Sequence, residues 1–273
     1  MSDAAANDEV HKPLLATLLH QGVYRIVMQR PERMNALSTE MMTALSAELQ
    51  KAAEDPAVRV ILLGAEGKVF CAGHDLKELT AARAEADGGK ATYERIMRQC
   101  SDLMQQIVRL PKPVIAVVTG VATAAGCQLV ASCDLAIATD TATFCTPGVN
   151  IGLFCSTPMV ALSRNVAPKQ AMEMLLTGES IDASTAKDFG LINRIVPGDY
   201  LEQVVQKYAE VIASKSSRTL KIGKEAFYRQ LEMPLGEAYD FAAKTMVENM
   251  MARDAEEGIS AFLQKRKPEW TDS

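Results

Sequence analysis

Hydrophobic positions in the first two-thirds of the chain alternate between short continuous runs and runs with helical spacing. Continuous apolar runs rich in β-branched residues predict buried strands at residues 23–28, 58–63, 113–118 and 135–138. Apolar residues three or four positions apart predict helices at residues 38–52 and 93–107, with Ser38 as the N-cap of the first. Strands that alternate with helices indicate an α/β fold with parallel strands and right-handed crossovers.

The last third of the sequence has a purely helical pattern. Helices are predicted at residues 200–213, 219–230, 235–251 and 258–265. This is more helix than one sheet needs for cover, and such a surplus often packs on a neighbouring subunit, so we expect an oligomer. The chain is therefore divided into a disordered N-terminus (residues 1–13), an α/β core (14–197) and a C-terminal helical region (198–273).

Composition and charge exclude several classes of protein. The chain is 48% hydrophobic and 23% charged, as is typical of globular proteins, and its net charge of −5 offers no basic surface to nucleic acid or to an anionic membrane. No apolar run approaches the roughly 18 residues of a membrane span. The N-terminal segment lacks the pattern of a secretory signal and contains acidic residues that transit peptides avoid, so we expect a cytoplasmic protein.

The six cysteines and three histidines limit the possible metal chemistry. No two cysteines form a C-x-x-C pair, and most lie in apolar or small-residue runs, which favours buried thiols in a reducing compartment. The histidines are His11, His20 and His74. A zinc site of cysteine and histidine is not expected, and we predict no metal.

Two turns rich in glycine and alanine carry the candidate chemistry. The first, residues 69–79 (VFCAGHDLKEL), and the second, residues 119–129 (TGVATAAGCQL), each follow a predicted strand and lead into a helix. Small side chains let a ligand approach the backbone, and a helix N-terminus offers free N–H groups. Two such turns at adjacent strand ends could direct two N–H groups at one oxygen, which is the arrangement of an oxyanion hole. Close packing of helix on sheet is the alternative explanation, and neither turn has the spacing of a phosphate loop or of a Rossmann turn.

Together the two turns resemble the paired motif of the crotonase (enoyl-CoA hydratase/isomerase) superfamily. The segments that carry the resemblance are RPERMNALS (30–38), AGHDLKEL (72–79), GVATAAGCQLVASCDLAIAT (120–139), TGESIDASTAKDFGLINRIVP (177–197) and GISAFLQKRKP (258–268), so it spans nearly the whole chain. The resemblance implies a crotonase-like ββα superhelix (spiral) core with a C-terminal helical trimerisation region, in homotrimers that often pair into hexamers. It also implies a lyase or isomerase of fatty acid metabolism that takes an acyl-coenzyme A thioester and has no permanently bound cofactor.

The family's site residues can be carried over by motif position. The resemblance assigns the oxyanion N–H groups to His74 and Ala125. The family usually has glycine at the second of these positions, and alanine keeps the N–H. The positions that match the coenzyme A site are Arg33, Met34, Ala36, Ala72, Asp75, Leu76 and Lys77, together with Phe262 and Lys265, which reach the nucleotide from a neighbouring subunit.

The sequence departs from the family at both positions that hold the hydratase glutamates. Gln128 stands at the first and Gly148 at the second. A glutamine amide cannot take up a proton near neutral pH and glycine has no side chain, so the general base and acid of hydration are both missing. Glutamate at both positions is expected to create hydratase activity if the scaffold is otherwise intact. Ser156 matches a catalytic carboxylate of the family's dehalogenase branch, but only His74 could serve it as a base, and simple packing or capping is the alternative.

Three functions remain open on the sequence alone. The first is a crotonase-type enzyme whose chemistry needs mainly enolate stabilisation, such as decarboxylation or thioester hydrolysis. The second is a non-catalytic acyl-CoA-binding protein that acts as a sensor or an assembly subunit. The third is a hydratase in which Gln128 holds the water and a group not yet located is the acid.

Overall fold

The fold is α/β, as predicted, and it combines two β-sheets with helices on both sides. A computed structural model describes residues 13–273, so the expected disordered segment 1–13 lies outside the described residues except for Pro13. The larger sheet has six strands in the order β1-β2-β3-β5-β7-β10. Their bounds are β1 (Leu15–His20), β2 (Val23–Met28), β3 (Val60–Ala65), β5 (Val114–Val118), β7 (Leu135–Thr139) and β10 (Arg194–Val196). Only β1 runs antiparallel to its neighbour, because a tight turn at Gly22 joins it to β2.

A second sheet of short strands follows the first along the chain. Its order is β4 (Val69–Cys71), β6 (Val121–Thr123), β8 (Thr143–Cys145) and β9 (Ile181–Asp182). The strands β3, β5 and β7 of the large sheet are each followed directly by β4, β6 and β8 of the small one, and β4, β6 and β8 pair in parallel. The chain therefore repeats a β-β-α turn, which is the spiral that the family resemblance implies.

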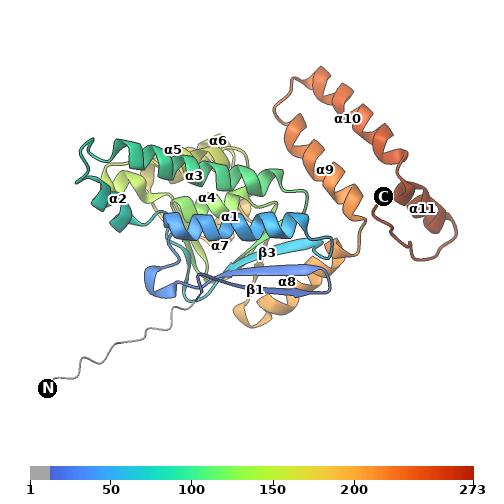
Figure 1. The fold of residues 1–273 in the computed structure, drawn as a ribbon, viewed down its shortest axis with the longest axis horizontal. Helices are drawn as coiled ribbons and strands as arrows, with labels where there is room; N and C mark the ends of the chain where they lie inside the picture. Colours follow the sequence, from blue (N-terminus) through green and yellow to red (C-terminus); the bar gives the residue numbers. More distant parts are fainter. Residues whose placement is uncertain (1–12) are drawn as a thin grey trace.

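Helices cover the large sheet on both faces. The helices α1 (Thr39–Glu54), α3 (Lys90–Arg109) and α4 (Ala125–Ser132) lie on one side, and α8 (Gly198–Ala213) lies on the other (Figure 1). The first begins as predicted, because the Ser38 side chain accepts a hydrogen bond from the Met41 N–H at 3.1 Å. Its predicted apolar face, Met41, Leu45, Leu49 and Ala52, is buried. The shorter elements are η1 (Pro31–Arg33), α2 (Leu76–Ala82), η2 (Pro147–Ile151), α5 (Ser156–Leu162), α6 (Pro168–Thr177) and α7 (Ala183–Asp188).

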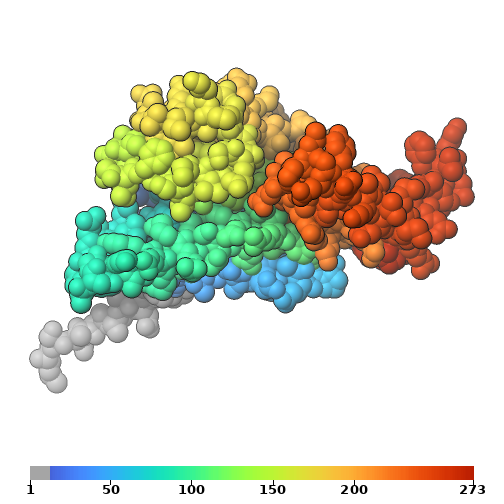
Figure 2. Space-filling model, turned by 90° about the horizontal axis from the view of Figure 1, so that it is seen from above, coloured from blue at the N-terminus to red at the C-terminus, as the bar shows by residue number. Residues whose placement is uncertain are grey.

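The last three helices form an arm beside the core. The arm consists of α9 (Ser217–Gln230), α10 (Leu235–Met250) and α11 (Arg253–Leu263), and its outer part stands apart from the rest of the chain (Figures 1 and 2). Within the predicted helical region 198–273, α8 differs from the arm because it packs on the sheet, where Leu201, Val205 and Ala209 are buried. The last helix begins at Arg253, five residues before the predicted start.

A buried ion pair joins α9 to the core. The Lys224 ammonium donates to the Asp134 carboxylate at 2.7 Å and to the carbonyls of Ile107 and Lys112 at 2.9 and 3.0 Å. The Tyr228 hydroxyl donates to the same carboxylate at 2.9 Å. Burial lowers the pKa of Lys224, and the Asp134 charge opposes that change. Asp134 therefore serves the docking of α9.

Candidate functional site

The two glycine- and alanine-rich turns lie against each other. They follow β4 and β6, which are parallel neighbours in the small sheet. Gly73 has a φ of +86°, and a Cβ added to it would lie 3.0 Å from the Ala125 nitrogen and 3.1 Å from the Thr123 oxygen. Only glycine therefore fits at this contact, and His74 is the next residue along the chain.

Both predicted oxyanion donors are N–H groups without a protein acceptor. Within residues 13–273, neither the His74 N–H nor the Ala125 N–H donates a hydrogen bond to the chain. Ala125 is the first residue of α4, so its N–H belongs to the unpaired first turn of a helix. A ligand oxygen between the two turns would satisfy donors that the protein leaves open.

The residue before the second donor has a strained backbone. Ala124 has φ of 52° and ψ of −119°, a conformation that residues other than glycine rarely adopt. It is held there because its N–H donates to the Cys145 carbonyl at 2.9 Å and its carbonyl accepts from the Gln128 N–H at 3.1 Å. Such strain costs on the order of 1–3 kcal/mol and is concentrated at functional sites. The two hydrogen bonds of Ala124 hold this conformation and so fix the direction of the Ala125 N–H.

The predicted coenzyme A residues of the first loop and the first turn form one surface. The Ala72 N–H donates to the Met34 carbonyl at 3.1 Å, and the Leu37 N–H donates to the Gly73 carbonyl at 2.7 Å. Arg33 and Asp75 approach to 4.0 Å. Seven of the nine predicted residues are thus brought together, namely Arg33, Met34, Ala36, Ala72, Asp75, Leu76 and Lys77. Met34 and Leu76 are more than half exposed, so an apolar surface accompanies the cations.

The other two predicted residues lie elsewhere in the single chain. Phe262 is at the end of α11 and is 82% exposed, and Lys265 follows it two residues after the helix. Figure 1 shows α11 and α2 at opposite ends of the molecule. Within one chain these two residues do not meet the surface around Arg33 and Lys77.

Asn35 organises the first loop and was not identified from the sequence. Its side chain is fully buried, accepts from the Arg30 N–H at 2.8 Å and donates to the carbonyls of Glu66 and Val69 at 2.9 and 2.8 Å. Its φ is +49°. Asparagine tolerates this left-handed conformation better than most residues, and this preference is the feature of the sequence that could have identified Asn35 as a structural residue of the loop.

Gln128 and Gly148, which the resemblance places at the positions of the hydratase glutamates, carry no carboxylate. Gln128 is 4% exposed, and its side-chain oxygen lies 4.0 Å from the Cys100 sulfur. At Gly148, an added Cβ would lie 2.9 Å from the Cys155 sulfur and 2.9 Å from the Leu153 oxygen. The Cys155 thiol therefore occupies the place where a side chain at position 148 would begin.

Cysteine thiols surround α4 and are neutral. Five of the six are buried and Cys145 is half-buried. Burial raises the pKa of Cys71 and of Cys100 to about 12, and it also raises the pKa of Cys145 and Cys155. A thiol that stays protonated is a poor nucleophile.

No hydrogen bond joins His74 to Ser156 within the described residues. The Ser156 hydroxyl is exposed and donates to the Phe154 carbonyl at 3.3 Å. Burial lowers the pKa of the His74 imidazole, and the Glu78 charge opposes that change. The His74 Nε2 is buried and has no hydrogen-bond partner in the described structure. Within the described residues, the His74 ring therefore has no hydrogen-bonded side chain that could orient it as a base.

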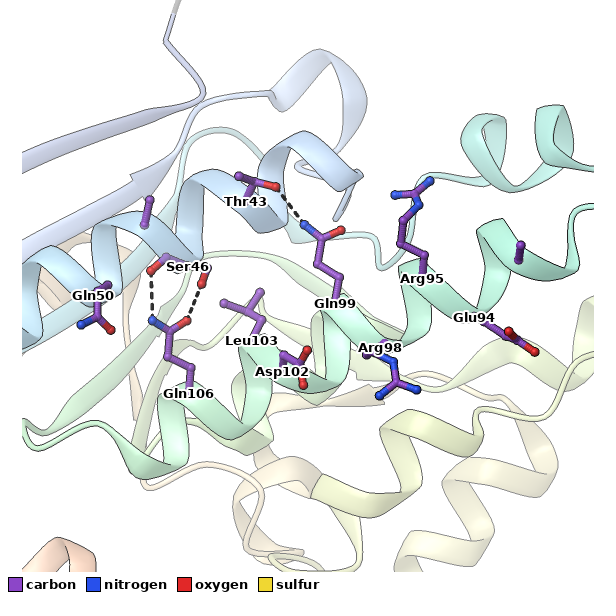
Figure 3. Close-up of a pocket in the computed structure, with 12 residues that line it drawn as sticks. Thr43, Ser46, Gln50, Glu94, Arg95, Arg98, Gln99, Asp102, Leu103 and Gln106 are labelled. Carbon is purple, nitrogen blue, oxygen red and sulfur yellow. Dashed lines mark hydrogen bonds between the residues drawn. The ribbon is translucent and has the colours of Figure 1, made fainter.

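An open groove of about 1100 Å³ lies between α1 and α3 (Figure 3). Gln99 donates to Thr43 at 2.9 Å and Ser46 donates to Gln106 at 2.7 Å across it. None of the predicted site residues lines this groove. Elsewhere, residues 13–273 contain no group of three histidine, cysteine or acidic side chains suited to a metal ion. No helix in the same range combines the length and the apolar character needed to cross a bilayer.

The chain is similar to curated proteins over nearly its whole length. It is 47% identical to enoyl-CoA hydratase domain-containing protein 3, mitochondrial, of Rattus norvegicus over 97% of this chain and 87% of that protein. The Homo sapiens protein of the same name is 48% identical over 92% of this chain and 81% of its own length.

These names contradict the expected cytoplasmic location. The relatives from rat, frog, mouse and human are all named as mitochondrial. The expectation rested only on the charge and hydropathy of the N-terminal residues, which lie outside the described structure and in which acidic residues do not exclude an organelle. The prediction of a cytoplasmic protein was wrong.

Solved structures and a family model agree with the spiral fold. A crystal structure of enoyl-CoA hydratase from Mycobacterium smegmatis has a TM-score of 0.90 and 50% identity, covering 95% of this chain and 99% of that one. The crystal structure of human enoyl-CoA hydratase domain-containing protein 3 has a TM-score of 0.90 and 46% identity, covering 94% and 100%. The family model described as enoyl-CoA hydratase/isomerase matches residues 19–273. The chain therefore belongs to the enoyl-CoA hydratase/isomerase (crotonase) family.

Proposed function

We propose that this protein binds an acyl-coenzyme A thioester and polarises its carbonyl with the N–H groups of His74 and Ala125. The observation that carries the proposal is the contact between the two turns, where the Gly73 backbone meets the Ala125 nitrogen. Two unpaired N–H groups at one place stabilise the negative charge that develops on a thioester oxygen. Removal of one such donor typically slows catalysis by roughly 100- to 1000-fold.

The surface around the first turn supports binding of the coenzyme A part. Arg33 and Lys77 are exposed cations on a chain of net charge −5. Both suit phosphate oxygens, and Met34 and Leu76 offer apolar contact beside them. Coenzyme A would bind as part of the substrate, and no resident cofactor is required.

The residues at the two glutamate positions do not suit hydration of an enoyl thioester. Hydration needs a base that activates water and an acid that protonates the α-carbon. Gln128 can do neither, and Gly148 has no side chain. Reactions that need only a stabilised enolate or a polarised carbonyl, such as decarboxylation or thioester hydrolysis, suit these residues better.

A non-catalytic acyl-CoA-binding role is the second candidate. It is favoured by the neutral character of the groups in and near the two turns, namely thiols whose pKa is raised and an imidazole whose pKa is lowered. Turnover of a malonyl-type thioester would separate the two candidates, because a binder returns the thioester unchanged.

We also propose that the arm packs against a neighbouring copy in a homotrimer. Exposed apolar side chains on α10 and α11 support this, since a cluster of several such side chains on a surface usually marks a site that another protein covers. Those more than half exposed are Leu235, Tyr239, Met246, Val247, Met250, Phe262 and Leu263. Assembly of this kind would bring Phe262 and Lys265 of one copy to the coenzyme A surface of another. Pairing of trimers into hexamers would leave this contact unchanged.

Calorimetric titration with acetyl-CoA tests the proposal. The wild-type protein should bind, and Lys77→Ala should bind about tenfold more weakly because a charge-assisted phosphate contact is lost. Lys207→Ala, which removes an exposed lysine from α8 on the opposite side of the sheet, is the matched control and should bind like the wild type. No detectable binding by the wild type at millimolar acetyl-CoA would refute the proposed function.

A further inference from the structure

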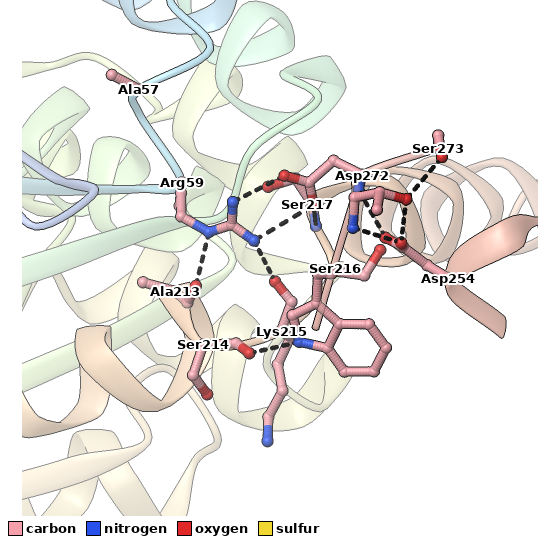
Figure 4. A network of polar contacts seen from close by, with 12 residues as sticks. Ala57, Arg59, Ala213, Ser214, Lys215, Ser216, Ser217, Asp254, Asp272 and Ser273 are labelled. Carbon is pink, nitrogen blue, oxygen red and sulfur yellow. Dashed lines mark hydrogen bonds and ion pairs between the residues drawn. The ribbon is translucent and has the colours of Figure 1, made fainter. Parts of the chain in front are cut away.

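The segment after α11 folds back to the junction between α8 and α9. The Trp270 ring nitrogen donates to the Ser214 carbonyl at 2.8 Å, and the Asp272 carboxylate accepts from the Ser217 N–H at 2.7 Å (Figure 4). We call Arg59, Asp254, Trp270 and Asp272 the latch, because these four side chains hold the returning segment.

Arg59 anchors the latch in the core. It directly precedes β3, and its guanidinium donates to the carbonyls of Ala213 and Lys215 at 2.7 and 2.6 Å. The same group donates to the Asp272 carboxylate at 2.8 and 3.3 Å. Its methylene groups lie over Gly22, where an added Cβ would be 2.9 Å from the Arg59 Cδ. One side chain thus joins the sheet, the end of α8 and the returning segment.

Asp254 joins that segment to α11. It lies in the first turn of α11 and is 2% exposed. Its carboxylate accepts from the N–H groups of Thr271 and Asp272 at 2.8 and 2.9 Å. The Trp270 ring packs on Gly258, where an added Cβ would be 3.1 Å from the ring. The pKa of Asp254 and of Asp272 is lowered because hydrogen bonds outweigh the desolvation of each carboxylate.

The latch therefore fixes the direction of α11 relative to the core. The rest of the arm reaches the core mainly through α9, since α10 packs on α9 and α11. The path from Arg59 through Asp272 to Asp254 consists of hydrogen bonds to charged side chains, which are shorter and stronger than neutral ones. The Trp270 bond to the Ser214 carbonyl adds a neutral contact beside this path. Phe262 lies at the far end of the helix that the latch holds, and Lys265 follows three residues later.

We propose that the latch residues are positioning residues for coenzyme A binding across the subunit boundary. This inference rests on the proposed function. By fixing α11, the latch holds Phe262 and Lys265 in the geometry that contacts the nucleotide bound by the neighbouring copy. Less conformational entropy is therefore lost when the ligand binds.

A double-mutant cycle on acetyl-CoA affinity tests this inference. Asp272→Asn keeps the shape of the side chain and removes its charge. It should weaken acetyl-CoA binding by about tenfold, as expected when a preorganised contact becomes mobile. In a background of Phe262→Ala and Lys265→Ala the same substitution should have no effect, because the groups that the latch positions are absent. Sedimentation at the same protein concentrations should give the same oligomer for all variants.

Two further variants keep the test decisive. Trp270→Phe retains the ring over Gly258 and removes only the hydrogen bond to Ser214, so it should show a smaller loss in the same direction. Glu202→Gln disrupts the matched Arg25–Glu202 ion pair, whose closest approach is 2.5 Å, and should bind like the wild type.

The outcomes separate this inference from the proposed function. Absence of acetyl-CoA binding by the wild type would overturn both. Wild-type binding together with an unchanged affinity of Asp272→Asn would overturn the latch alone. An equal loss in both backgrounds would also overturn it, because a general loss of stability would not depend on Phe262 and Lys265.

Discussion

A side chain at position 148 should destabilise the fold because Cys155 already occupies its place. A Cβ added to Gly148 would lie 2.9 Å from both the Cys155 sulfur and the Leu153 oxygen. The Leu153 N–H donates to the Gly148 carbonyl at 2.9 Å, so the loop cannot open without losing that bond. Gly148→Ala is therefore a test of overpacking, with an expected loss of about 1–3 kcal/mol in the free energy of unfolding.

Urea unfolding followed by circular dichroism measures this loss. In a Cys155→Ala background, Gly148→Ala should cost about 1 kcal/mol less than in the wild type, since one of the two close atoms is gone. Gly236→Ala is the matched control, because an added Cβ there has no neighbour within 4 Å, and alanine should not destabilise α10. A Gly148→Ala protein within about 0.5 kcal/mol of the wild type would refute the argument that Cys155 fills this space.

The same geometry changes what is needed to build a hydratase on this scaffold. From the sequence alone, Gln128→Glu with Gly148→Glu should suffice. The structure indicates that Cys155→Ala is needed as well, because it removes the sulfur that lies 2.9 Å from an added Cβ, so that only the Leu153 carbonyl has to shift. Loss of the enoyl absorbance of crotonyl-CoA should remain near the uncatalysed rate for the wild type and for the double variant, and should accelerate only in the triple variant.

Three further predictions concern the parts that hold the site and the arm. Lys224→Met should lower the free energy of unfolding by about 3–5 kcal/mol, because it leaves a partly buried carboxylate without its cation, whereas Lys221→Met, an exposed lysine on the same helix, should change it little in the same urea assay. Asn35→Ala should cost about 2–4 kcal/mol in lost buried hydrogen bonds and should weaken acetyl-CoA binding measured by calorimetry. The Arg266 hydrogen bonds lower the pKa of Glu257 to about 2. The Glu257–Arg266 ion pair should therefore contribute fully to the stability of the arm above about pH 4.3, and this contribution should be lost as the pH falls towards about 2. A pH titration of the fluorescence of the single tryptophan would follow the loss.

The regular elements were predictable because their signals are local. Residues 23–28 form a strand with the predicted bounds, and Ser38 caps α1 as expected. The small sheet was missed, because strands of two or three residues inside glycine- and alanine-rich turns have no measurable periodicity. The strand β1 was also missed, since its outer residues are exposed at the edge of the sheet.

The meeting of the two turns was predictable from local motifs, whereas contacts between distant segments were not. The closeness of His74 and Ala125 follows from two turns at adjacent parallel strands. The occupation of the Gly148 space by Cys155 depends on how a loop closes seven residues later, and no local pattern indicates it. Arg59 and Asp272 are 213 residues apart, so the latch could be found only in three dimensions.

A crystal structure of the protein with acetyl-CoA bound would test the central claim most directly. The account predicts that the thioester oxygen lies about 2.7–3.1 Å from both the His74 nitrogen and the Ala125 nitrogen. A thioester oxygen that contacts neither N–H, or a ligand seated in the groove between α1 and α3 instead, would contradict it.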